Sequence, residues 1–392
     1  MIQRAYKYRI FPNKEQVELF EQHFGSTRFV FNWGLEKKIK AYQKDKKRLT
    51  CFDLINELTK LKKEKDFEWL NEVNSQSLQV SLRNLDNAFT NFFRKQNKFP
   101  NFKSKKHNKN SFQILQHLKL SEKLDIPKIK DIKIIQHRKL EGKIKTATIS
   151  KTTTGKYYIS ILIEQSKDLP KKDKIKDKTT IGIDLGIKTF ATISDGRKID
   201  NPKYLKKSER KLKRQQRWLS RKIKGSKNRN KQRIKVALIH EKINNQRSDF
   251  LHKFSHQLTH ENQVSSIAIE DLNVKGMVKN HYLARSISDV AWNEFKRQLE
   301  YKCDWYGKNL LVIGRFEASS KTCSCGVVNQ DLKLSDREWT CKECKTKHDR
   351  DILAANNIKK FALIPQGLRK STPPERTILV GSLKEEAFGS LA

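Results

Sequence analysis

Two apolar runs in the second half of the chain each end in a carboxylate, and this pattern constrains the fold more than any other feature. The run 181–183 is followed by Asp184, and the run 267–269 is followed by Glu270. Short apolar runs of this kind are typical of buried strands. An ionised carboxylate buried without a partner is costly or takes up a proton. We therefore expect each acid to face a bound cation, with a paired core carboxylate or a strand-end cap as the alternative.

Predicted strands and helices alternate around these two runs. Residues 179–199 predict three strands with a turn at Asp195–Gly196, and further strands are expected at 265–272 and 309–316. Helical patterns occupy 203–235, about 285–307 and the segment from about 349. Strands and helices that alternate in this way are typical of an α/β domain with a central sheet.

A third acid follows from the last helical pattern. If that helix begins near Asp349, then Asp351 lies on the same face as Ala354, Ala355 and Ile358. Asp349 is better explained as a helix cap, and Asp271 as a turn or cap residue. Asp184, Glu270 and Asp351 would then hold two divalent ions roughly 3.5–4 Å apart, an arrangement that hydrolyses phosphodiesters. Carboxylate oxygens favour Mg²⁺ or Mn²⁺.

The overall charge indicates a polyanionic partner. The chain has 392 residues with 84 Lys and Arg against 43 Asp and Glu, a formal net charge of +41. Such a surface repels itself unless it meets a polyanion, so nucleic acid is the expected partner. A Lys-rich proteome is the alternative explanation. No run approaches the roughly 20 apolar residues of a membrane span, and we expect a cytosolic protein with no membrane partner.

Residues 203–235 are the most basic part, with sixteen Lys or Arg and one acid, Glu209. Leucines at 205, 212 and 219 predict a helix with a narrow apolar seam, followed by a turn at Gly225–Ser226. Like charges three or four residues apart destabilise an isolated helix. We therefore expect a phosphate backbone to neutralise them, with a solvated helix as the alternative. The candidate contacts are Lys206, Lys207, Arg210, Lys213, Arg214, Arg217 and Arg221.

The first half of the chain predicts a strand at 2–11, helices from Asn13 to about 97, and a small β unit. A hairpin is expected around Thr154–Gly155–Lys156, and residues 167–178 are expected to be a linker. The clearest helix spans 74–93. Its polar face carries amides and an arginine that are candidates for reading base edges, although a solvated face explains them as well. These candidates are Gln76, Gln79 and Arg83.

Four of the six cysteines cluster near residue 330. Cys341 and Cys344 have the two-residue gap of a zinc knuckle, whereas Cys323 and Cys325 are separated by one residue. In an extended segment the latter two would point to opposite sides. We expect structural Zn²⁺ bound by all four sulfurs. His348 in place of one sulfur, or a metal-free segment, are the alternatives. Cys51 and Cys303 are expected to be buried apolar residues.

Several motifs together resemble the TnpB (OrfB) proteins of bacterial insertion sequences, which are related to type V CRISPR effectors. They are GIDLGIKTFATIS, IAIEDLNVKGM, ISDVAWNEFKRQLEYKCDWYGK, SSKTC…REWTCKECKTKHDRDI and QGLRKSTPPERT. The resemblance implies an RNase H-like (RuvC) nuclease, a guide RNA transcribed from the transposon end, and cleavage of double-stranded DNA beside a short motif. An RNA-guided repressor with decayed catalysis and a transposase acting on transposon ends are the alternatives.

The resemblance also implies a domain layout. Residues 1–12 and 112–170 would form a β-barrel-like wedge module, and 13–111 a helical recognition module. Residues 171–365 would form the nuclease domain, with a basic helical insert at 203–260 and a zinc-ribbon-like segment at 319–348. A tail, 366–392, follows. Asp184, Glu270 and Asp351 would fall in the three RuvC motifs. The family usually has Asn two residues after the third acid, where this chain has Leu353.

Overall fold

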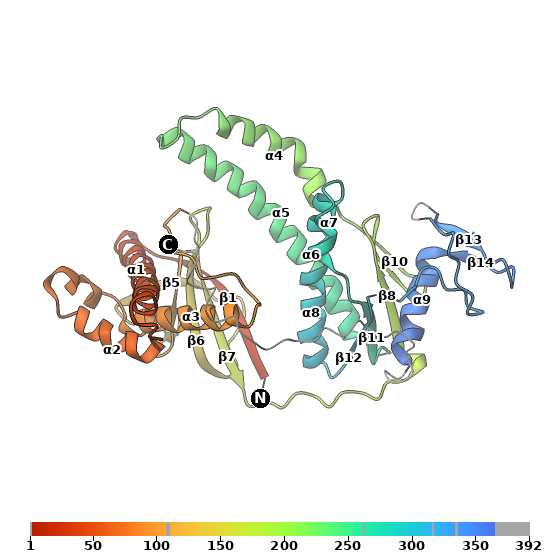
Figure 1. The fold of residues 1–392 in the computed structure, drawn as a ribbon, viewed down its shortest axis with the longest axis horizontal. Coiled ribbons are helices and arrows are strands. Elements are labelled where there is room, and N and C mark those ends of the chain that lie inside the picture. Colours follow the sequence, from red (N-terminus) through yellow and green to blue (C-terminus); the bar gives the residue numbers. More distant parts are fainter. Residues whose placement is uncertain (1, 107–109, 262, 316, 334–335, 365–392) are drawn as a thin grey trace. The chain divides into compact units, whose positions relative to one another are not determined.

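The structure, a computed structural model, describes residues 2–106, 110–261, 263–315, 317–333 and 336–364 (Figure 1). The expected tail, 366–392, lies outside these residues. The described chain divides into two compact units, the first ending at Lys167 and the second beginning at Asp168. Each unit has its own sheet and its own apolar core.

The first unit contains a seven-stranded antiparallel sheet. Its order is β2-β6-β7-β1-β5-β4-β3, so the N-terminal strand lies in the middle, between β7 and β5. The predicted strand at 2–11 and the predicted hairpin around Gly155 are both confirmed. The strands are β1 (Ile2–Phe11), β2 (Asn110–Ile114), β3 (Lys119–Leu120), β4 (Lys123–Ile126), β5 (Ile129–Ile135), β6 (Lys143–Lys151) and β7 (Tyr157–Gln165).

Helices α1 (Lys14–Asp45), α2 (Cys51–Leu61) and α3 (Ser75–Phe93) complete the first unit, with a 3₁₀ helix η1 (Lys65–Asn71) between the last two. Asn13 caps α1 as expected: its side chain accepts from the Gln16 amide, and the Gln16 side chain accepts from the Asn13 amide. This capping box satisfies two amides that the first turn leaves free. Helix α3 confirms the predicted helix at 74–93.

The second unit is built on a five-stranded mixed sheet in the order β10-β9-β8-β11-β12. Strand β11 runs parallel to both β8 and β12, whereas β9 is antiparallel to β8 and β10. The central strands β8 and β11 are buried along most of their length. The strands are β8 (Thr180–Leu185), β9 (Thr189–Ile193), β10 (Lys198–Asp200), β11 (Ser266–Glu270) and β12 (Asn309–Ile313).

The helices of this unit include a long pair, α4 (Tyr204–Ser220) and α5 (Lys227–His260), joined by the predicted turn at Gly225–Ser226. The expectation of one continuous helix at 285–307 is wrong. Ala291 adopts φ 58°, a left-handed conformation that ends one helix and starts another. The remaining elements are η2 (Asp177–Thr179), α6 (Val274–Met277), α7 (Ala284–Val290), α8 (Trp292–Trp305), β13 (Glu338–Thr340), β14 (Lys347–Asp349) and α9 (Arg350–Leu363).

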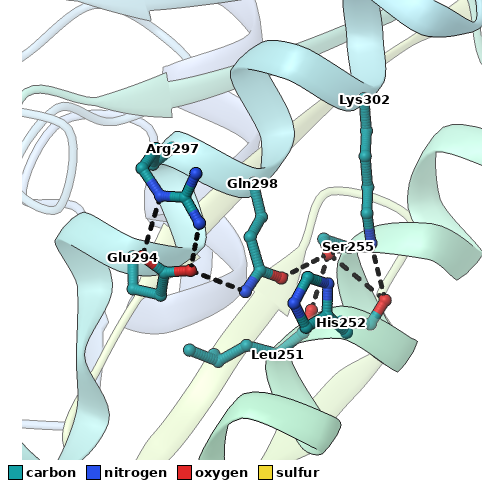
Figure 2. Close-up of polar contacts among 7 residues, drawn as sticks. All are labelled: Leu251, His252, Ser255, Glu294, Arg297, Gln298 and Lys302. Carbon is teal, nitrogen blue, oxygen red and sulfur yellow. Dashed lines mark hydrogen bonds and ion pairs between the residues drawn. The ribbon is translucent and has the colours of Figure 1, made fainter. Parts of the chain in front are cut away.

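A polar network fastens α8 to the C-terminal half of α5 (Figure 2). The buried Lys302 ammonium donates to the His252 carbonyl and to Ser255 Oγ, each at 2.7 Å. The buried Gln298 accepts from Ser255 Oγ at 2.9 Å and donates to Glu294 Oε1 at 3.0 Å. Since buried polar groups are costly unless paired, this network fixes one register between the two helices.

Replacing Lys302 by methionine is expected to remove a pH dependence of stability. Burial lowers the pKa of Lys302 from 10.5 to about 8. Between these values the unfolded chain binds more protons than the folded one, so the free energy of unfolding rises with pH. From pH 7 to pH 9 the unsubstituted protein should gain about 1 kcal/mol relative to Lys302→Met, measured by urea denaturation. Identical pH profiles would contradict a buried ammonium at this position.

Among the residues that the structure describes, no helix is both long enough and apolar enough to span a membrane.

Candidate active site

Asp184 and Glu270 lie next to each other because they are at the carboxyl ends of two neighbouring parallel strands, one residue before the end of β8 and at the end of β11. Ile183 of β8 is paired in register with Ile269 of β11, and each acid directly follows one of these residues. The carboxyl ends of adjacent parallel strands meet at one edge of the sheet, which is where α/β folds commonly place their ligands. The sheet therefore brings together two acids that are 86 residues apart in the sequence.

Helix α9 brings Asp351 to the same edge. Asp349 caps the helix, as expected, by accepting from the amides of Asp351 and Ile352. The expected apolar face is confirmed, since Ala354, Ala355 and Ile358 are buried.

The helix packs closely on β8, and Gly182 makes this approach possible. A Cβ at that position would lie 2.0 Å from the Ala355 carbonyl oxygen and 2.7 Å from the Lys359 amide nitrogen.

Substituting Gly182 by alanine is therefore expected to push α9 away from β8 and to carry Asp351 out of place. Overpacking of this kind costs about 1–3 kcal/mol of folding free energy, and any cleavage activity should fall with it. Thermal denaturation and a cleavage assay measure the two effects. Gly25→Ala is the matched control, because no atom lies within 4 Å of its added Cβ. If the Gly182→Ala protein were as stable as the Gly25→Ala control, the close packing of α9 on β8 would be contradicted.

Burial raises the pKa of two of the acids, Asp184 and Glu270. Burial is the largest cause that raises the pKa of Asp184 to about 7, and the neighbouring charges of Glu270 and Asp351 add to it. Burial also raises the pKa of Glu270, while a hydrogen bond from Ser319 Oγ acts in the opposite direction. Carboxylates that share a site in this way are stabilised by a bound cation.

Two further residues that the sequence did not single out, Arg337 and Ser319, contact the acids, and a third, Asn357, holds Ser319. Arg337 Nη1 lies 3.4 Å from Asp351 Oδ1. Ser319 hydrogen-bonds Glu270, and its carbonyl accepts from the buried Asn357 of α9 at 2.7 Å. Asn357 stands out in retrospect, because it is a polar residue in the otherwise apolar buried run of α9. Asp271, by contrast, forms ion pairs with Lys296 and Arg315.

The four clustered cysteines converge on one point. The sulfurs of Cys323, Cys325, Cys341 and Cys344 all lie within 4.8 Å of one another. Cys323 and Cys344 are 3.4 Å apart, and Cys325 and Cys341 are 3.7 Å apart. Tetrahedral zinc with Zn–S bonds of about 2.3 Å separates its sulfurs by roughly 3.8 Å. The geometry therefore suits a single tetrahedral metal ion.

The shortened first pair reaches this point because it forms a turn rather than an extended segment. Gly326 adopts φ +96°, and its amide donates to the Cys323 carbonyl at 2.9 Å. The Cys323 amide in turn donates to the Val327 carbonyl at 2.8 Å. The one-residue gap of the first pair therefore still allows the Cys323 and Cys325 sulfurs to lie on the same side, close to the other two.

Two other residues surround the cluster. His348 Nε2 lies 3.0 Å from Cys323 Sγ, close enough to hydrogen-bond a thiolate. Leu353 is buried against Cys323, Cys341 and Trp339. The residue that departs from the family pattern thus anchors α9 to the cysteine segment.

The basic stretch forms an exposed surface on α4. Leu212 packs against Val236, Ile239 and Ile243 of α5, so the predicted apolar seam is confirmed. The cations point outward, and Lys213 is paired with Glu209 at 2.7 Å. The exposed candidates are Lys206, Lys207, Arg210, Lys213, Arg214, Arg217 and Arg221.

In the first unit, α3 presents two faces to different surroundings. The candidates Gln76, Gln79 and Arg83 are partly or fully exposed, and Gln76 donates to Gln116 at 3.1 Å. A neighbouring face of α3 lines a cleft of about 380 Å³. The polar residues that line this cleft are Thr27, Arg28, Ser77, Ser81, Asn84, Lys103, Ser111, Gln113 and Thr148.

The chain matches known sequence families over most of its length. The family described as "Probable transposase" matches residues 160–281, a "Cas12f1-like, TNB domain" matches 292–358, and a "Helix-turn-helix domain" matches 1–47. In this structure the segment that matches the helix-turn-helix family, residues 1–47, contains strand β1 and one long helix, α1.

Full-length relatives extend the match. The chain is 40% identical over 389 residues to the "Putative RNA-guided DNA endonuclease" of Streptomyces pristinaespiralis. This alignment covers 96% of this chain and 93% of the relative. It is 32% identical over 373 residues to the protein of the same name, InsQ, of Escherichia coli K12, covering 91% of each.

Among solved structures, the fold resembles the Cas12f1 chain of a Cas12f1–sgRNA–target DNA complex. The TM-score is 0.54 with 16% sequence identity, over 88% of this chain and 83% of the other. The fold therefore agrees with the sequence matches. This chain belongs to the TnpB (OrfB) family of insertion-sequence proteins.

Proposed function

We propose that this protein is an RNA-guided DNA endonuclease encoded by an insertion-sequence transposon. It would cleave double-stranded DNA beside a short motif and act in the bacterial or archaeal cytosol. The observation that carries the proposal is the convergence of Asp184, Glu270 and Asp351 at one edge of the sheet. The names of the full-length relatives support the same activity.

The fold that we propose for the nuclease unit is RNase H-like. Its support is the strand order β10-β9-β8-β11-β12, in which an antiparallel meander of β8, β9 and β10 adjoins two parallel strands. In this fold the first strand lies in the middle of the sheet, where its terminal acid meets the acid of the neighbouring strand. Asp184 and Glu270 would occupy these two positions.

The three carboxylates fit hard divalent cations such as Mg²⁺ or Mn²⁺. They offer only oxygen ligands, and the charges of Glu270 and Asp351 add to burial in raising the pKa of Asp184, which a bound cation would offset. The chemistry that two such ions would supply is activation of a water molecule and stabilisation of the leaving oxygen of a phosphodiester. Asp184 and Glu270 would hold the ions from the rigid sheet, and Asp351 from the first turn of α9. Ser319 would orient Glu270 through its hydroxyl.

The cysteine cluster would hold a structural Zn²⁺. Four sulfurs at tetrahedral spacing fill every coordination position of a zinc ion, as in structural sites. A catalytic zinc site would keep one position open for water or substrate. Through Leu353 and Asn357, the folded segment would support the start of α9, which carries Asp351.

The test is to purify the protein from cells carrying its native locus and to sequence the RNA that accompanies it. A duplex that matches this RNA should be cut in Mg²⁺. Tight guide-dependent binding without cutting would instead indicate a repressor. Joining of transposon ends without RNA would indicate a transposase. Absence of bound RNA would contradict every RNA-guided function.

A further inference from the structure

A pocket of about 220 Å³ lies within the first unit, where the end of α1, the start of α2 and the end of α3 meet. The three acids of the candidate active site belong to the other unit. Pockets that enclose drug-sized ligands usually measure about 300–1,000 Å³. This pocket therefore suits a single planar ring system whose substituents extend out of it.

Three aromatic rings contribute to the apolar wall of this pocket. Tyr42 and Phe89 are buried, whereas Phe93, one helical turn beyond Phe89 on α3, is 50% exposed. The rings of Phe89 and Phe93 have centroids 6.3 Å apart and an interplanar angle of 27°. An exposed phenyl ring beside buried ones is unfavourable in water, and it offers a face on which a planar aromatic ligand stacks.

A second wall is the short connection between α1 and α2, which is fixed at both ends. Lys46 ends α1 in a left-handed conformation with φ 51°. Thr50 caps α2 by accepting from the Asp53 amide at 3.2 Å. Between them, the Leu49 carbonyl accepts from Lys38 Nζ at 2.6 Å. These contacts hold the backbone of the connection in place.

The charge that the pocket offers to a ligand is positive. Asp86, the acid of its described lining, is paired with the largely buried Lys38 at 2.9 Å. Lys47 and Arg48 also line the pocket, and neither forms an ion pair with a residue that the structure describes. Adjacent ammonium and guanidinium groups match a phosphate monoester, which carries nearly two negative charges at pH 7 and accepts paired hydrogen bonds from arginine.

An aromatic wall beside two unpaired cations is complementary to a planar base that carries a phosphate. We propose that this pocket binds a free purine mononucleotide. The base stacks on Phe93, and the terminal phosphate lies between Lys47 and Arg48. A purine covers more of the aromatic wall than a pyrimidine does. This inference is independent of the three acids and of DNA cleavage.

A nucleotide within a nucleic-acid strand has the same chemical groups but fits this pocket less well. Each of its phosphodiesters carries a single charge, whereas the two cations suit the dianion of a monoester. A strand would also have to leave the small pocket in both directions. Free nucleotide is therefore the ligand to which the pocket is assigned.

The experiment uses the full-length protein and 2-aminopurine riboside 5′-monophosphate, a purine nucleotide whose fluorescence falls when its base stacks. Divalent ions are left out, so binding does not depend on the metals of the three acids. We expect quenching with the unsubstituted protein and with Phe93→Tyr, which keeps the aromatic face. Phe93→Ala should bind the probe about 5- to 150-fold more weakly. Phe52→Ala is the matched control and should quench normally, because this ring is 73% exposed and does not line the pocket.

The phosphate contact is tested by replacing Lys47 and Arg48 together with alanine. The unsubstituted protein should bind the monophosphate more tightly than the riboside without phosphate, and the double variant should bind both equally. The charge-matched control replaces Lys60 and Lys63, two exposed lysines at the other end of α2, with alanine. This control should keep the preference for the monophosphate.

Three outcomes would overturn the inference. The first is equal quenching by Phe93→Ala and Phe52→Ala. The second is loss of the phosphate preference in the lysine control, which would assign binding to the overall charge. The third is displacement of the probe by inorganic phosphate, or by a short oligodeoxynucleotide, as effectively as by adenosine monophosphate. With the oligodeoxynucleotide, that result would assign the pocket to a nucleic-acid strand.

Discussion

Replacing Asp184 by asparagine is expected to lower the rate of DNA cleavage by about a thousandfold or more. Asp184 lies one residue before the end of the central strand of its sheet, and the charges of Glu270 and Asp351 both raise its pKa. Asparagine keeps the shape of the side chain and removes the negative charge that binds a divalent ion. Metal-ion catalysis is worth several kcal/mol, and each 1.36 kcal/mol is a factor of ten in rate.

The measurement is a single-turnover cleavage assay with the RNA-loaded protein, together with a binding assay on the same DNA. Binding should persist in Asp184→Asn, because the carboxylate repels phosphates rather than attracting them. Asp200→Asn is the matched control, since it removes an exposed carboxylate from β10 of the same sheet. Undiminished cutting by Asp184→Asn would show that these acids are not the catalytic centre.

Replacing Cys341 by serine is expected to reduce the zinc content from about one ion per chain to nearly none. The buried Cys341 packs with Leu353 and Trp339, so loss of the ion should also unfold the cysteine segment. Structural zinc contributes about 10–16 kcal/mol to the folding of zinc-finger peptides, which is far more than the small apolar cluster provides. Cleavage should fall as well, because Ser319 and α9 lose their support.

Zinc is measured by elemental analysis of the purified protein, and unfolding of the segment by limited proteolysis. Cys51→Ser is the control, because that cysteine is buried in the core of the first unit, far along the chain from the cluster. His348→Gln should retain the ion if the four sulfurs are the ligands, and lose it if the imidazole replaces one. A full-length protein without zinc would contradict the assignment.

The acids could be found from the sequence because their environment is encoded locally. An apolar run that ends in a carboxylate predicts both a buried strand and an acid at its end, and β8 and β11 have this form. The cap at Asp349 and the buried face of α9 follow from helical spacing alone. These features depend on neighbours within one turn or one strand.

Other features depend on contacts that no local pattern encodes. The break at Ala291 interrupts a stretch with good helical periodicity, and the helix that follows it, α8, packs on α5. Arg337 and Ser319 meet the acids only after the cysteine segment has folded back on α9. The pocket beside Phe93 joins parts of three helices, and an exposed phenylalanine gives no signal of that in the sequence.

Helix α9 makes contacts on several of its sides. Asp351 faces the acids, Leu353 the cysteine segment, Ala355 the glycine of β8, and Asn357 the Ser319 carbonyl. One inserted or deleted residue rotates everything beyond it by 100°, so all the later contacts would be lost together. The turn at Cys323–Gly326 has no such constraint and accommodates a shorter first cysteine pair. Changes in length during the divergence of this protein are therefore expected in the loops of the cysteine segment, while the spacing within α9 stays constant.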